Sequence, residues 1–90
     1  MLDVQEAAHR ASEYFAGLYS DQSVSSVQLE EVELTDDGQY WLITLSYPEL
    51  PHDVALVPIN FAFKRKYKVF KIDAKTGEVK SMKIRNVEKR

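Results

Sequence analysis

The sequence predicts an α+β fold in which an N-terminal helix packs on a four-stranded antiparallel meander sheet. Apolar residues recur every three or four positions as far as Tyr19, and at every second position from Val24 onward. Turn sequences then separate the alternating segments. A chain of 90 residues suits a single domain, residues 1–90, with one compact core.

The first element is expected to be an amphipathic helix from Asp3 to Tyr19. Asp3 suits the N-cap, and Glu6 follows three residues later as in a capping box. Because alanines make the apolar stripe thin, the helix can lie close to a sheet. The stripe consists of Val4, Ala7, Ala8, Ala11, Phe15 and Leu18.

The first strand begins after Val24 and changes parity along its length. Val27 and Leu29 alternate with polar residues, but Val32 and Leu34 resume on the other parity. The one-residue shift predicts a β-bulge near Glu30-Glu31. Asp36-Asp37-Gly38 then predicts a tight hairpin into the next strand.

The second strand, Gln39 to Tyr47, is apolar on both faces and is therefore expected to be central. All three prolines follow in Pro48–Asn60. This segment is long for a connection in a small domain, and long ordered loops tend to be functional. Its apolar residues, among them Leu50, Leu56 and Ile59, suit either a lid on the core or an exposed docking segment.

The last two strands are expected at Phe61–Asp73 and Glu78–Val87, joined by a type I turn with Gly77 as a positive-φ bulge. That register places Phe70 opposite Met82 and Ile72 opposite Lys80, on the face beneath the helix. The other face is expected to be polar and basic and to meet water or a partner. It carries Tyr67, Val69, Lys71, Ser81, Lys83 and Arg85.

This last hairpin resembles that of the PepSY-type domain. Residues Tyr67 to Val79 read YKVFKIDAKTGEV and follow the pattern aromatic-x-V-x-x-x-D-A-x-T-G-E-V. The resemblance extends loosely from Val4 to Val87. It implies a small non-catalytic domain, often found beside peptidases or in cell-envelope proteins, that inhibits or regulates proteases. The long proline segment and the expected lack of a leader, anchor or attached enzyme depart from that pattern.

The charges are sorted along the chain. Residues 1–60 contain one basic residue, Arg10, against eleven acidic ones, and residues 61–90 contain eleven basic residues against three acidic ones. The net charge of −2 therefore hides two oppositely charged parts. With acidic and basic strands at opposite sides of the meander, we expect either weak, salt-sensitive self-association or neutralisation within one molecule.

Composition excludes several classes of protein. The chain has no cysteine, which rules out disulfides and cysteine-based zinc sites. The N-terminus lacks the basic and apolar regions of a signal peptide, and no apolar run approaches the ~20 residues of a membrane span. We expect a cytoplasmic protein that needs no cofactor.

Few residues suggest catalysis or metal binding. His9 has Glu13 one turn away, which could make a weak metal pair, but an exposed helix histidine is the simpler interpretation. His52 and Asp53 are adjacent, so their side chains point apart in an extended segment. The acidic run Glu30–Asp37 lacks the spacing of a calcium loop and suits a charged strand that protects a sheet edge. We therefore predict no catalytic and no metal site.

Two functions compete, and neither is enzymatic. The first is a protein-interaction domain, regulatory or inhibitory, that binds an unidentified partner through Leu50, Leu56, Ile59, Tyr67, Lys71, Lys83 and Arg85. The alternative is a nucleic-acid-binding module on the basic C-terminal hairpin, using Lys64, Lys66, Tyr67, Lys71, Lys83 and Arg85. The slightly acidic protein and the absence of RNA-binding sequence motifs favour the first.

Overall fold

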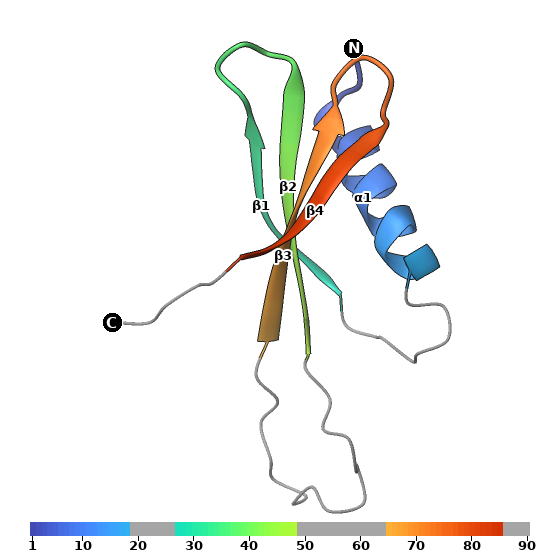
Figure 1. The fold of residues 1–90 in the computed structure, drawn as a ribbon, viewed down its shortest axis with the longest axis vertical. Coiled ribbons are helices and arrows are strands. Elements are labelled where there is room, and N and C mark those ends of the chain that lie inside the picture. The colour runs from blue at the N-terminus through green and yellow to red at the C-terminus, as the bar shows by residue number, and fades with distance from the viewer. Residues whose placement is uncertain (19–26, 49–64, 86–90) are drawn as a thin grey trace, which may run out of the picture.

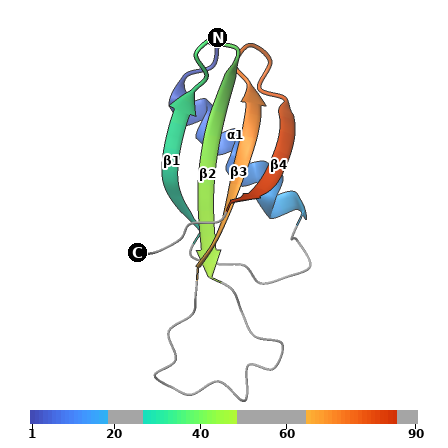
Figure 2. The ribbon, with the colours of Figure 1, turned by 60° about the vertical axis from the view of Figure 1, so that its left-hand side comes forward.

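The computed structural model describes residues 1–18, 27–48 and 65–85. The elements follow one another as α1 (Val4–Leu18), β1 (Gln28–Leu34), β2 (Tyr40–Pro48), β3 (Arg65–Asp73) and β4 (Val79–Arg85). The strands form one antiparallel sheet in the order β1-β2-β3-β4 (Figure 1). Figure 2 shows α1 running diagonally across one side of this sheet. The predicted α+β meander is confirmed.

Helix α1 begins where the sequence predicts. The backbone N–H of Glu6 donates a hydrogen bond to Asp3 Oδ1 at 2.8 Å, so Asp3 is the N-cap. Ala7 and Ala11 are completely buried, and Phe15 is also buried. Because these alanines are small, the helix backbone lies close to the sheet and Phe15 fills the remaining space.

The core is a single layer between α1 and the two central strands. Phe15 packs its ring 5.0 Å from that of Tyr47 and 6.3 Å from that of Phe70, between ring centroids. Burial of these side chains supplies most of the hydrophobic stabilisation of the described residues. The fully enclosed sheet residues of the core are Ile43, Leu45, Phe70 and Ile72.

The first hairpin contains the predicted bulge. Leu29 lies opposite Leu45 while Glu31 lies opposite Thr44, so Glu30 is the extra residue of β1. This shift keeps the apolar residues of β1 on the helix side and its glutamates on the other side. The hairpin turn is also confirmed, with Gly38 at φ 72°.

The second hairpin differs from the prediction at one point. Phe70 lies opposite Met82 as expected, but Ile72 lies opposite Val79, so the predicted pairing of Ile72 with Lys80 is wrong. A register shift beside Ile72 adds one residue to β4 and turns Val79 toward the core. Lys80 then remains exposed.

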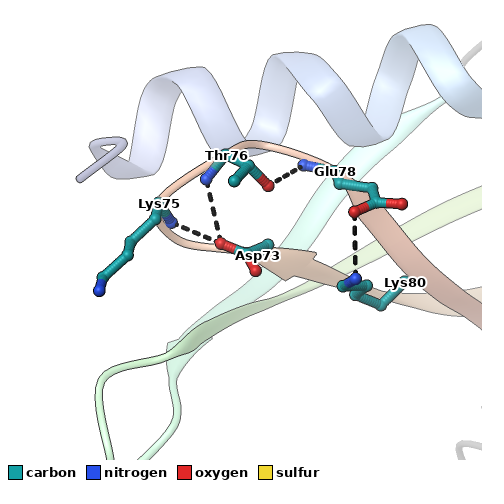
Figure 3. Close-up of polar contacts among 5 residues, drawn as sticks. All are labelled: Asp73, Lys75, Thr76, Glu78 and Lys80. Atoms are coloured by element: carbon teal, nitrogen blue, oxygen red, sulfur yellow. Dashed lines mark hydrogen bonds and ion pairs between the residues drawn. The ribbon is translucent and has the colours of Figure 1, made fainter.

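The turn between β3 and β4 is held by its own side chains (Figure 3). The carboxylate of Asp73 accepts hydrogen bonds from the backbone N–H groups of Lys75 at 2.8 Å and Thr76 at 3.0 Å. These two donors lower the pKa of Asp73 below its ordinary value. Gly77 has a φ of 80°, which confirms its predicted positive-φ position.

Part of the predicted proline segment falls inside the sheet. Pro48 is the last residue of β2 and lies opposite Arg65. Residues 49–64, which include Leu50, Leu56 and Ile59, lie outside the described part of the chain. The choice between lid and docking segment therefore stays a prediction.

Candidate functional site

The sheet face opposite α1, called the open face below, carries the candidate site. Directly opposite residues of antiparallel strands share a face. Thr44 lies opposite both Glu31 and Val69, and Val69 lies opposite Lys83, so these residues form one row across the sheet. The remaining open-face residues include Glu33, Tyr40, Leu42, Ser46, Tyr67, Lys71, Ser81 and Arg85.

Four residues predicted to contact a partner come together on the open face. Tyr67 on β3 lies opposite Arg85 on β4. Lys71 lies opposite Ser81, and Lys83 is two residues farther along β4. Lys71 and Lys83 are therefore diagonal neighbours, which places these residues roughly 7–8 Å apart, with their Cβ atoms somewhat closer.

Other basic residues in the C-terminal part of the chain do not join this group. Lys66 lies opposite Tyr47 and Lys68 opposite Leu45, which places both on the helix side of the sheet. Lys80 forms an ion pair with Glu78 at 3.0 Å, which raises the pKa of Lys80. Lys64 lies outside the described residues. The basic surface is therefore smaller than the number of lysines and arginines implies.

Lys71 is held over an aromatic ring. Its Nζ atom lies 4.3 Å from the centroid of the Tyr40 ring, a cation–π contact between β3 and β2. Both side chains are half-buried. The contact orients the ammonium group along the open face without neutralising its charge.

Arg85 is already engaged within the molecule. Its Nη1 atom forms an ion pair with Glu31 on β1. The same nitrogen donates a hydrogen bond to Thr44 Oγ1 at 3.0 Å. The alternative of neutralisation within one molecule thus holds for this pair. Arg85 contributes less positive charge to the surface than the sequence predicts.

A second network surrounds Ser46, whose side chain is completely buried. Its hydroxyl donates to Glu30 Oε2 at 2.5 Å and accepts a hydrogen bond from Arg65 Nε at 2.9 Å. Arg65 Nη2 also donates to the Ser46 carbonyl at 3.1 Å. The bulge at Glu30 brings its carboxylate to this position. A buried hydroxyl with two charged partners is satisfied in full, as buried polar groups require.

Sequence reasoning missed both networks. It interpreted the glutamates of β1 as protection of a sheet edge, and it expected a general balance of charge between the two parts of the chain without naming the partners. The available signal was a pair of small polar residues, Thr44 and Ser46, in a strand that is otherwise apolar at its centre. Such residues in a central strand need hydrogen-bond partners from the neighbouring strands.

Among the described residues, the other candidate side chains form no metal site. His9 Nε2 lies 3.3 Å from Glu13 Oε2 on the exposed side of α1. In residues 1–18, 27–48 and 65–85, no group of three or more potential metal ligands occurs. His52 and Asp53 lie outside these ranges. No helix in the described part of the chain is long and apolar enough to cross a membrane.

The residues of the hairpin motif that resembles PepSY-type domains have structural roles in the turn and beside it. Asp73 binds two backbone N–H groups, Thr76 Oγ1 accepts from the Glu78 N–H at 3.2 Å, and Gly77 supplies the positive φ (Figure 3). Ala74 is buried, and Val79 packs on the core. The motif therefore stabilises the hairpin and marks no binding site by itself.

Comparison with models of known protein families, with curated proteins and with solved structures finds no match to this chain.

Proposed function

We propose that this protein is a small PepSY-like interaction domain that binds an acidic segment of a partner protein on the open face. The observation that carries the proposal is the placement of Lys71 and Lys83 as diagonal neighbours on that face. Neither lysine forms an ion pair with another described residue. Two cations at this spacing suit a partner segment with carboxylates on alternate residues of an extended chain.

The surroundings of the two lysines suit a protein ligand. Val69 lies beside Lys83, and Leu42 lies opposite Lys71, and both apolar side chains are half-buried. Tyr67 adds an aromatic ring with a hydroxyl on the same face. A mixture of aromatic, apolar and cationic groups is typical of interaction surfaces. Because exposed ion pairs are weak, the affinity is expected to be modest and to fall with salt.

The resemblance to PepSY-type domains extends this proposal to a regulatory role. On that basis the partner is a peptidase or another enzyme that the domain inhibits. The apolar residues Leu50, Leu56 and Ile59, which lie outside the described residues, would then also contact the partner. Polar substitution of all three is expected to reduce binding, and unchanged binding would remove this segment from the proposal.

Affinity capture from the native lysate tests the proposal. The tagged protein is expected to retain a specific partner at low salt, and Lys71→Glu is expected to abolish retention. Lys75→Glu is the matched control, because it makes the same change of charge in the β3–β4 turn, away from the open face. Equal retention by wild type and Lys71→Glu would contradict the proposal.

Nucleic-acid binding is the second candidate, favoured by one observation. Lys71 lies over the Tyr40 ring, and Tyr67 lies on the same face, a combination that suits stacking of single-stranded bases. This function predicts a mobility shift with a single-stranded oligonucleotide at low salt, lost steeply as salt rises. Retention that disappears after nuclease treatment would favour this candidate over a protein partner.

A further inference from the structure

The two edge strands of the sheet carry complementary chemistry. β1 and β4 are the outer strands, so each has one side without a neighbouring strand among the described residues (Figure 2). Their unpaired backbone groups are a template for pairing with another strand. β1 is exposed along nearly its whole length.

Each edge strand has one apolar side and one charged side. On the helix side, Val32 of β1 is 41% exposed and Ile84 of β4 is 73% exposed. On the open face, β1 presents Glu31 and Glu33. β4 presents cations there instead.

We propose that β4 of one copy pairs antiparallel with β1 of a second copy, with Lys83 opposite Glu33 and Ile84 opposite Val32. The same register places Met82 opposite Leu34 and Arg85 opposite Glu31. Apolar residues thus meet on the helix side, and opposite charges meet on the open face. This contact lies at the sheet edges and shares only Lys83 with the open-face function proposed above.

The register is selective. A shift must be by two residues to keep the faces matched. In one direction Ile84 would then lie opposite Glu30, at the bulge. In the other direction Lys83 would lie opposite Thr35, and a single charge pair, Arg85 opposite Glu33, would replace the two of the proposed register.

Symmetric pairing is disfavoured by charge. Two β1 strands placed side by side would bring Glu31 and Glu33 of one copy against the same glutamates of the other. Two β4 strands would bring Lys83 and Arg85 together in the same way. Like charges directly opposite each other destabilise strand pairs. The contact is therefore head-to-tail.

In a pair of copies joined head-to-tail, each copy keeps one free sheet edge. Further copies can therefore add to the assembly. In this meander β1 and β4 run in opposite directions, so a second copy added sideways in the same orientation continues the antiparallel sheet. Such heterologous contacts produce open chains or closed rings rather than symmetric dimers.

The Lys83–Glu33 pair carries the specificity. Arg85 and Glu31 already bind each other within one molecule, whereas neither Lys83 nor Glu33 forms an ion pair with another described residue. Pairing between copies would give both a partner. Because the pair is exposed, salt is expected to weaken the association.

Reversing the charge of Glu33 or of Lys83 tests this contact, with self-association measured by sedimentation velocity at low salt. Wild-type protein is expected to show a sedimentation coefficient that rises with concentration and falls on addition of salt. Glu33→Lys alone and Lys83→Glu alone are each expected to weaken association about tenfold. An equimolar mixture of the two variants is expected to restore it, because each then meets an opposite charge.

The apolar half of the contact has its own test. Ile84→Gln is expected to weaken association, whereas Leu18→Gln, an exposed apolar position at the end of α1, is expected to leave it unchanged. Melting curves of all variants check that they fold.

A wild type that stays monomeric at low salt and high concentration, or a mixture that fails to restore association, would overturn the proposal. Lys71→Glu lies on an inner strand, so loss of partner capture and loss of self-association can be observed separately.

Discussion

Arg85 on β4 binds Glu31 on β1 across the open face, although β2 and β3 lie between their strands. The strong twist of the sheet is visible in Figure 1, where the strands cross one another. Thr44 on β2 lies beneath the contact and accepts a hydrogen bond from the same arginine. The two oppositely charged parts of the chain are thus linked within one molecule at this point.

The Arg85–Glu31 ion pair is expected to stabilise the fold by a small but measurable amount. The two side chains are 42% and 54% exposed, so solvent screens the ion pair. A double-mutant cycle with Glu31→Gln and Arg85→Gln is expected to give a coupling energy of about 0.5–1 kcal/mol in urea unfolding at low salt. The coupling should shrink as salt rises, and a coupling of zero at low salt would show that this ion pair does not stabilise the fold.

Removal of the Ser46 hydroxyl is expected to cost more. Ser46→Ala leaves Glu30 and Arg65 without the buried group that both of them bind, and should lower the free energy of unfolding by about 1–3 kcal/mol. Ser81→Ala, a half-buried serine on β4, is the control and should change it by less than about 0.5 kcal/mol. Equal effects of the two substitutions in denaturant unfolding would refute the structural role of Ser46.

The two positive-φ glycines are expected to differ in tolerance. An alanine at Gly38 meets no atom within 4 Å, so Gly38→Ala should cost only the backbone strain of about 1–2 kcal/mol. A Cβ at Gly77 would lie 3.0 Å from Leu2 Cδ2 and 3.1 Å from Arg10 Nε. Gly77→Ala should therefore be the more destabilising change in thermal unfolding, and the reverse order would contradict the described packing of the N-terminus on this turn.

Stability is expected to fall in acid through the two turn aspartates. Hydrogen bonds from Thr35 and Gln39 lower the pKa of Asp37, and those from Thr76 and Lys75 lower the pKa of Asp73, both from an ordinary 3.8. Because the pKa is lowered in the folded protein, each ionised carboxylate stabilises the fold at pH values above its pKa in the unfolded chain. This contribution disappears as the pH falls through its pKa in the folded protein.

Thermal unfolding between pH 7 and pH 2 measures this effect. The midpoint temperature of unfolding should fall once the pH is below about 4. Asp73→Asn should make this fall shallower, because its side chain no longer titrates. Asp36→Asn is a matched control, because it makes the same substitution in the first hairpin and leaves the described hydrogen bonds of Asp37 and Asp73 in place. A wild-type midpoint that is independent of pH over this range would contradict the assigned hydrogen bonds.

Local chemistry made most of the fold predictable. The Asp3 cap, the alanine stripe of α1, the bulge at Glu30 and the Gly77 turn all depend on residues close together in the chain. Each could be inferred because helix caps, turns and side-chain alternation follow short-range rules. The same rules place Tyr67, Lys71, Lys83 and Arg85 on one face from the alternation of side chains alone.

Tertiary structure decided which charged groups meet. Arg85 and Glu31 are 54 residues apart in sequence, and their contact depends on the twist of four strands and on the bulge in β1. The same is true of Arg65, Ser46 and Glu30, and of the register shift that turned Val79 rather than Lys80 toward Ile72. Short-range sequence patterns are therefore sufficient to establish the elements and their order. The partners of its charges were decided by non-local register and twist, because side-chain ion pairs form only where the backbone brings their ends within a few ångströms.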